Sequence, residues 1–276
     1  MKTQSFFLFG LALLLSLPVS AQKFGTRLWG SESSWRVKSI DLGLGVEQDM
    51  VNRLSFDYLK NNLRDADALA AFGGKNFESA DVYSMICENP HLRLGLTLES
   101  NVLKNTELRI AGVAILNRID AISYYNDQYD YFQTSEYLNI SSYTNEVAGE
   151  IALVKSAYLT KFFRVFGGAG TNLGFSMGNY MNVNASNMNV VNDWSLLETG
   201  QITGPIVEEE YYYDNFDVRS GIQQRVFGQV GFGLTLFRKL EFGMEGRFGA
   251  GYRYHFGGEA SMTRLNSFAM TARWML

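Results

Sequence analysis

The sequence predicts an all-β protein, an antiparallel up-and-down barrel of about eight strands that crosses a membrane. The first indication is residues 239–256, where apolar residues or glycines occupy every even position and charged residues, glycine or histidine occupy the odd ones. Such alternation gives a strand one apolar face and one polar face. Because this run is roughly three times the usual strand length, it fits a strand tilted across a bilayer, with lipid outside and a polar lumen inside.

The N-terminal residues indicate that the chain is exported. Residues 1–21 contain one early lysine, an apolar core from Phe6 to Leu17 and the small-residue ending VSA. This is the pattern of a cleavable signal peptide, and the apolar core is shorter than the ~20 residues that a spanning helix needs. We therefore expect a signal peptide over residues 1–21, a periplasmic N-terminal segment over 22–35 and an outer-membrane barrel over 36–276.

Eight segments of the chain show the alternation of membrane strands. In the C-terminal one, Phe268, Met270 and Trp274 share one parity while Arg273 lies on the other. The alternation is less regular in two segments. In one it is interrupted at Lys155, and the other contains several glycines. In chain order the predicted strands are 36–47, 91–100, 106–117, 145–159, 163–176, 221–237, 239–256 and 263–276.

The connections between these segments support a barrel in the outer membrane. Long links at 48–90, 118–144 and 177–220 alternate with short ones at 101–105, 160–162 and 238. Outer-membrane barrels have short periplasmic turns, longer external loops and an even number of strands. The link at 257–262 is the exception, since it is a tight turn at Gly257 and Gly258.

A barrel of ten strands is the alternative count. The third long link contains two alternating pieces, one with Met181 and Val183 and another with Ile202 and Ile206. These pieces would be either extensions of neighbouring strands or an additional strand pair.

The polar faces of the strands would crowd many charges into one lumen. The interior of an eight-stranded barrel is just wide enough for side chains, and buried charges persist only when they are paired and hydrogen-bonded. A hairpin centred near residue 259 would place Glu245 opposite Arg273. We expect an ionic network that fills the lumen, and a charge-selective pore is the alternative. The predicted network is Asp41, Glu47, Arg93, Glu99, Glu107, Arg109, Arg225, Glu241, Glu245, Arg247, Arg253 and Arg273.

Two segments of the long links have patterns of their own. Residues 48–72 have helical spacing at Val51, Leu54, Tyr58 and Leu59 and are followed by two glycines, which predicts a short helix over the external mouth. The second segment is an acidic and aromatic run that would bind a cation, a glycan or a protein partner, or would be a solvated loop. Its candidate binding residues are Glu208, Glu209, Glu210, Tyr211, Tyr212 and Tyr213.

Composition excludes several classes of function. The net charge is −4 for the whole chain and −5 once Lys2 is removed with the signal peptide, so nothing indicates nucleic-acid binding. The single cysteine, Cys87, cannot form an internal disulfide. One cysteine and two histidines lack the spacing of a metal site, and no motif indicates a cofactor. His255, Glu259 and Ser261 are close in sequence, but a tight hairpin collects such residues without chemistry, and we predict no catalytic residue.

These features resemble a known family. The signal ending SAQ, about eight alternating strands, outer loops rich in tyrosine and asparagine, and a last strand carrying Trp274 and Leu276 at alternate positions resemble the Bacteroidetes-type outer-membrane β-barrel superfamily. That group includes proteins similar to the OmpA transmembrane domain and to the PorT component of type IX secretion. One departure is the C-terminal leucine, where such barrels usually carry an aromatic residue.

The resemblance implies a location in the outer membrane, contact with outer-membrane lipid and insertion by the barrel-assembly machinery. It does not specify a function, because one fold supports many. We expect a non-enzymatic structural protein or one that binds a protein partner through its long external loops. The alternatives are an accessory component of a secretion or transport machine, as for PorT, and an enzyme that modifies outer-membrane lipid.

Overall fold

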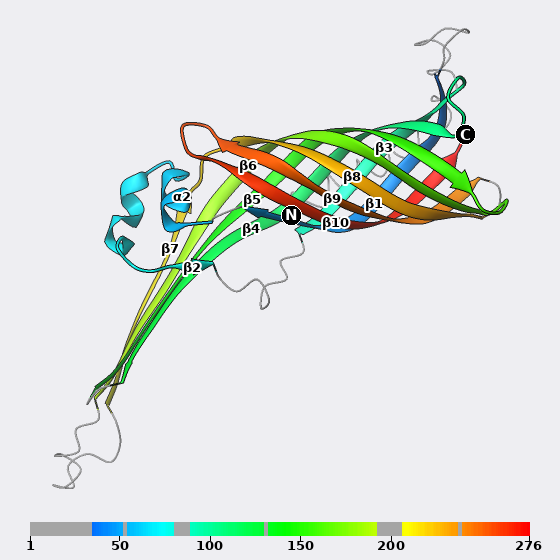
Figure 1. Cartoon of the computed structure of the whole chain (residues 1–276). Helices are drawn as coiled ribbons and strands as arrows, with labels where there is room; N and C mark the ends of the chain where they lie inside the picture. The colour runs from blue at the N-terminus through cyan, green and yellow to red at the C-terminus, as the bar shows by residue number, and fades with distance from the viewer. Residues whose placement is uncertain (1–34, 52–53, 80–88, 130–131, 192–205, 237–238) are drawn as a thin grey trace, which may run out of the picture.

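The chain forms a closed antiparallel β-barrel from which a narrow sheet extends at one end (Figure 1). The computed structural model describes residues 35–51, 54–79, 89–129, 132–191, 206–236 and 239–276. The predicted all-β barrel is confirmed. The predicted signal peptide, Cys87 and Ile202 lie outside the described residues.

Eight strands make the barrel wall. Each pairs with the next in the ring, and the last returns to pair with the first, so that the wall has no free edge. The predicted count of about eight barrel strands is therefore confirmed. In ring order the strands are β1 (Trp35–Val51), β3 (Asn89–Ser100), β4 (Thr106–Tyr129), β5 (Phe132–Tyr158), β6 (Phe163–Val191), β8 (Gly221–Leu236), β9 (Leu240–His255) and β10 (Ala260–Met275).

Alternation along each strand separates an apolar outer surface from a charged interior. On β9, Phe242 and Phe248 point outward and are about half exposed, whereas Glu241 and Glu245 are buried in the lumen. The same parity rule holds for strand after strand because successive side chains leave a pleated strand on opposite sides. A belt of exposed aliphatic and aromatic side chains therefore surrounds the barrel.

Three wall strands continue far beyond the barrel. β4, β5 and β6 contain 24, 27 and 29 residues, whereas β8, β9 and β10 contain 16 each. β7 (Ile206–Asp217) pairs with the far part of β6, and the short β2 (Glu78–Ser79) pairs with β4. We call this sheet, made of β7, β2 and the far parts of β4–β6, the extension.

The extension corrects two sequence-based expectations. The long links predicted at 118–144 and at the start of 177–220 are wrong, because β4, β5 and β6 run through most of these residues. Among the described residues, ten strands lie in one sheet, but β2 and β7 are outside the ring, so the ten-stranded barrel is also wrong. Met181 and Val183 belong to β6, and Ile206 begins β7.

Irregular residues mark where the barrel becomes the extension. The β4–β5 ladder shifts register between Ile115 and Arg118, around Asn117 with its positive φ of 52°. The backbone N–H of Asn117 donates to Asn145 Oδ1 over 3.0 Å, beside the shift in the β5–β6 ladder. Gly178 on β6 also has a positive φ, 62°. Because a bulge bends its strand and increases the local twist, this row directs the sheet away from the barrel wall.

Two short helical segments lie at the same end of the barrel as the extension (Figure 1). They are α2 (Phe56–Asn61) and the 3₁₀ helix η1 (Ala66–Phe72), which we call the lid. The Ser55 side chain caps α2, and Gly73 follows η1. The predicted short helix is confirmed, although Val51 is the last residue of β1. Neither segment has the length and apolar character needed to cross a membrane.

The lid is held by the main hydrophobic core of the protein. Tyr58, Leu59, Leu63 and Leu69 are buried against one face of the extension, to which β4, β5 and β6 contribute buried aliphatic side chains. Burying each aliphatic side chain stabilises the contact by about 1.5–3 kcal/mol. The core therefore lies outside the barrel, between the lid and the extension.

The β9–β10 hairpin has a different register from the one predicted. Its turn includes Gly257 with a positive φ of 74°, a conformation that suits glycine. Arg273 lies opposite Glu241, and Glu245 lies opposite Ala269. The expected pairing of Glu245 with Arg273 is wrong because the hairpin turns about two residues earlier than assumed.

Candidate functional site

The barrel lumen holds a dense set of ionised side chains. Within the part of the chain that the structure describes, nine carboxylates and eight arginines are buried in the protein, all on the inward parity of their strands. Lys38, half buried at one end, adds a ninth cation that contacts Glu107 at 2.8 Å. Equal numbers of opposite charges reduce the cost of removing each from water.

These charges form three tiers along the barrel axis. The lower tier, farthest from the lid, contains Asp41, Glu107, Glu241, Arg164 and Arg273. Arg164 bridges Glu107 at 3.0 Å and Glu241 at 2.5 Å. Arg273 contacts all three carboxylates at 3.3–3.5 Å. Each carboxylate therefore has at least one arginine partner.

The middle tier contains Glu150, Glu245, Arg93, Arg109 and Arg247. Arg247 donates to Glu150 at 2.6 and 3.0 Å and to Glu245 at 2.6 Å. Arg109 contacts Glu245 at 2.6 Å, and Arg93 contacts Glu150 at 2.9 Å. Three arginines thus form ion pairs with two carboxylates, so this tier carries one excess positive charge.

The upper tier lies next to the lid and has the opposite balance. Arg225 forms five hydrogen bonds, two to Asp49, two to Glu146 and one to Asn172. Arg118 contacts Glu146 at 2.5 Å. Four carboxylates face three arginines, so this tier carries one excess negative charge. Its members are Glu47, Asp49, Asp120, Glu146, Arg118, Arg225 and Arg253.

The structure brings together eleven of the twelve residues proposed for the lumen network. Glu99 is the twelfth, and it lies half-exposed at the lower end, where Arg36 and Lys38 contact it. Sequence analysis missed six further buried members, namely Asp49, Arg118, Asp120, Glu146, Glu150 and Arg164. The parity of Glu146 and Glu150, opposite to that of Val147 and Ile151, was the signal that would have found two of them.

The lid covers the upper tier. The Tyr58 ring lies edge-on to His255, with ring centroids 6.2 Å apart, and burial raises the pKa of the Tyr58 hydroxyl to about 12. Asn62 Oδ1 accepts from the backbone N–H of Glu259 at 2.9 Å, and Arg219 Nε donates to the Leu63 carbonyl at 2.7 Å. These bonds attach the lid to the outer ends of β8, β9 and β10.

The face of the extension opposite the lid is exposed and rich in tyrosine, asparagine and serine. We call it the extension face. One row across it contains Tyr125, Tyr137, Ser186 and Tyr211, one residue from each of β4, β5, β6 and β7. The adjoining row contains Ser123, Asn139, Asn184 and Tyr213. Nearer the barrel, Tyr143 and Tyr180 stack with ring centroids 4.8 Å apart.

The acidic and aromatic run proposed for binding lies on β7. Tyr211 and Tyr213 are 71% and 64% exposed and belong to the extension face. Tyr212 points the other way and packs against Phe72 of the lid, with ring centroids 5.6 Å apart. Glu209 and Glu210 are exposed, and Glu208 lies on the same strand. The run is therefore a strand with two distinct faces, and only its odd-numbered tyrosines are available on the extension face.

The hairpin residues weighed as an enzyme site have other partners. His255 is buried, with Nδ1 3.0 Å from the Arg219 carbonyl. The Glu259 carboxylate accepts from the Asn61 side chain at 2.7 Å, and the Ser261 hydroxyl donates to the Met262 carbonyl at 3.3 Å. Each side chain thus stabilises the turn or the lid. Within the residues that the structure describes, no group of three metal-ligating side chains is found.

No family model and no curated protein matches the chain. Among solved structures, the attachment invasion locus protein Ail of Yersinia pestis is similar at 7% identity, with a TM-score of 0.38 and coverage of 87% of this chain and 98% of Ail. The outer membrane protease OmpT from Escherichia coli is similar at 10% identity, with a TM-score of 0.28 and coverage of 87% and 97%. The outer membrane channel DcaP of Acinetobacter baumannii follows at 7% identity and a TM-score of 0.19, with coverage of 89% and 99%. Scores this low add no argument about function.

Proposed function

We propose that the protein spans the outer membrane as a closed barrel and binds a protein partner through the extension face. The barrel would serve as an anchor, and the lumen as its structural core. The outward apolar belt supports insertion into lipid, since a barrel satisfies its backbone hydrogen bonds internally and can expose apolar side chains. The short turns would then face the periplasm, and the extension and the lid would face the outside.

The observation that carries the proposal is the composition of the extension face. Tyrosine offers a large amphipathic surface at low conformational cost, and serine and asparagine offer adaptable hydrogen bonds, which is the composition of many binding surfaces. Tyr137 and Tyr211 lie in one row with Tyr125, across four strands. The lid covers part of the opposite face, where Tyr212 packs against Phe72.

The lumen supports an anchoring role for the barrel. Buried arginine–carboxylate contacts occupy it at three levels, and the lid lies over the upper end. An eight-stranded barrel has an interior that side chains can fill. We infer that transport through the lumen is not the function of this protein.

Site-specific crosslinking on intact cells tests the proposal. A photoreactive amino acid at Tyr213 should crosslink to one discrete partner, and the same residue at Leu234 on the outward belt should not. The double variant Tyr211→Ala/Tyr137→Ala should remove the partner while the barrel stays folded, because these side chains are exposed. Equal crosslinking at both positions, or a double variant that retains its partner, would contradict the proposed binding face.

An accessory role in a secretion machine remains the second candidate, as the resemblance to PorT-like proteins implies. The same experiment separates the two, because a secretion component would be recovered with other membrane-embedded proteins in fixed stoichiometry. A lipid-modifying enzyme would instead change the acyl chains or headgroups of outer-membrane lipid upon expression.

A further inference from the structure

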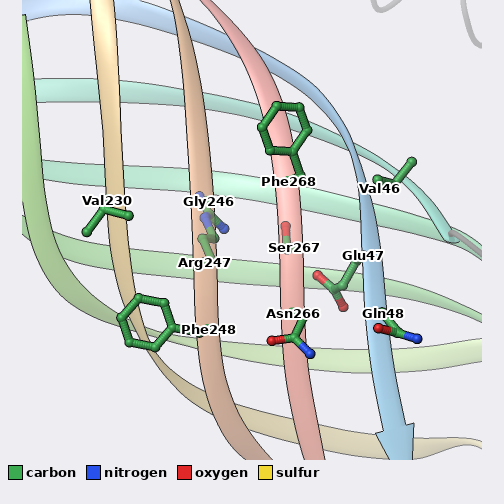
Figure 2. A pocket seen from close by; sticks show the side chains of 10 residues that line it. All are labelled: Val46, Glu47, Gln48, Val230, Gly246, Arg247, Phe248, Asn266, Ser267 and Phe268. Carbon is green, nitrogen blue, oxygen red and sulfur yellow. The ribbon is translucent and has the colours of Figure 1, made fainter.

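A groove of about 450 Å³ lies on the outer surface of the barrel, across β8, β9, β10 and β1 (Figure 2). This volume is within the range of small-ligand sites, ~300–1,000 Å³. The side chains that define its outward face are those of even-numbered residues, which point away from the lumen. Glu47, Arg247 and Ser267 also line the groove, but they have the inward parity, so the groove adjoins the ionic network through the barrel wall.

The groove exists because one side chain is missing from the apolar belt. Gly246 lies in a row with Val230 on β8, Phe268 on β10 and Val46 on β1. A Cβ atom placed on Gly246 would meet no other atom within 4 Å. Phe248, the next outward residue of β9, is 57% exposed and forms a wall beside this gap. The result is an apolar channel one side chain wide.

Polarity changes in steps along β10 at one end of the groove. Phe268 is followed on the same face by Asn266 and then by Arg264, toward the end that carries the lid. Gln48 of β1 lies directly opposite Asn266 and adds a second amide. Residues i and i+2 of a strand are about 7 Å apart, so the amides and the cation lie within about 14 Å of Phe268.

Arg264 has no counterion on this surface. It is exposed and makes no ion pair within the described part of the chain. The neighbouring acidic residues of β1, Glu47 and Asp49, have the opposite parity and are buried in the lumen. The outer surface thus offers an apolar channel, then two amide groups, and then a positive charge.

We propose that this groove binds one anionic phospholipid, a conclusion that rests on the membrane insertion proposed above. One acyl chain would lie over Gly246 against Phe248 and Phe268. The phosphate would contact Arg264, with the amides of Asn266 and Gln48 as hydrogen-bond donors. Arginine suits this role because its guanidinium matches phosphate oxygens in a charge-assisted hydrogen-bond geometry.

A second copy of the chain fits the groove less well. A two-fold contact brings the same patch of each copy together, so a dimer centred on the groove would place two Arg264 side chains near each other. Like charges in a medium of low dielectric repel strongly. A phosphate-bearing lipid instead supplies the missing negative charge.

Native mass spectrometry of the full-length protein in mild detergent tests the proposal, with dioleoyl-phosphatidylglycerol and dioleoyl-phosphatidylcholine as probes. The wild type should retain one phosphatidylglycerol about fivefold better than phosphatidylcholine, the effect of about one interfacial cation. Arg264→Gln should abolish this preference, and Arg264→Lys should keep most of it. Gly246→Leu should lower retention of both lipids by filling the groove.

A matched control is available on the other side of the barrel. Gly149 on β5 is also exposed, and a Cβ atom there would also meet nothing within 4 Å. Gly149→Leu should therefore bind lipid as the wild type does. Equal retention in Arg264→Gln and the wild type overturns the lipid site, as does a dimer that Gly246→Leu dissociates. A chain that never enters bilayers and never shows a heat-modifiable band would refute membrane insertion itself, which is a distinct outcome.

Discussion

The balance of charge within each tier predicts how much each arginine contributes to stability. We consider Arg225→Met in the upper tier and Arg247→Met in the middle tier. Both arginines are buried and each contacts at least two carboxylates. Methionine keeps an unbranched chain at the site and removes the charge. The two variants therefore differ mainly in what they leave unpaired.

The two losses should differ in size. Arg225→Met leaves four carboxylates with two arginines, and it removes five hydrogen bonds. Arg247→Met leaves two carboxylates with two arginines, since Glu150 keeps Arg93 and Glu245 keeps Arg109. Removing one partner of a buried ion pair costs about 3–5 kcal/mol. We expect about 5 kcal/mol for Arg225→Met and about 3 kcal/mol or less for Arg247→Met.

Urea titration of the protein in vesicles, followed by tryptophan fluorescence, measures both losses. Adding Glu146→Gln to Arg225→Met removes one of the two excess negative charges of the upper tier and should restore about 1–2 kcal/mol, within the range of couplings between contacting residues. Leu234→Ala on the outward belt is the control, because lipid can fill the space it vacates. Losses below about 1 kcal/mol for both variants, as for exposed ion pairs, would show that water replaces the arginines, and the packed lumen would be refuted.

Four further predictions concern the barrel, its orientation, its lumen and its lid. Folded protein in sodium dodecyl sulfate should migrate differently from a boiled sample, because a closed barrel has no free edge to open; identical migration, or release of the protein from cells without detergent, would contradict the barrel. In a Cys87→Ser background, Glu210→Cys should react with an impermeant maleimide on intact cells and Leu103→Cys only after permeabilisation, and the reverse pattern would invert the topology. The wild type should show no steady conductance in a planar bilayer, and an ion-selective current would contradict the filled lumen. Burial favours the neutral form of Tyr58, so its contribution to stability is complete below about pH 10 and is lost as the pH rises from about 10 to 12; urea titrations at about pH 8 and about pH 11 should show this loss in the wild type and less of it in Tyr58→Phe.

The barrel strands could be predicted because a two-sided environment leaves a period of two in the sequence. The segment 239–256 alternates without a break and matches β9 (Leu240–His255) to within a residue at each end. β6 contains glycines on both of its faces, and its start at Phe163 was still predicted correctly. The closing of the ring followed from the even number of predicted strands.

The extension could not be predicted in the same way, because its environment is different. Its exposed face is polar, and its buried face is apolar only where the lid covers it, as at Leu138 and Ile140. Such a pattern resembles a hydrophilic loop. The register shift around Asn117 also changes the parity of Arg118 relative to the preceding strand. Arg118 and Asp120 were missed for this reason, although Glu47, Arg225 and Arg253 of the same tier were predicted.

The continuity of β4, β5 and β6 gives the extension mechanical properties. A span of about twelve residues at ~3.3 Å each reaches about 40 Å from the rim of the barrel, and only the bulges near Asn117 and Gly178 interrupt it. A pull along these strands loads many interstrand hydrogen bonds in shear at the same time and does not unzip them one by one. Tension at the tip would therefore pass directly into the barrel wall, so that the protein partner proposed for the extension face would be held at a fixed distance from the barrel.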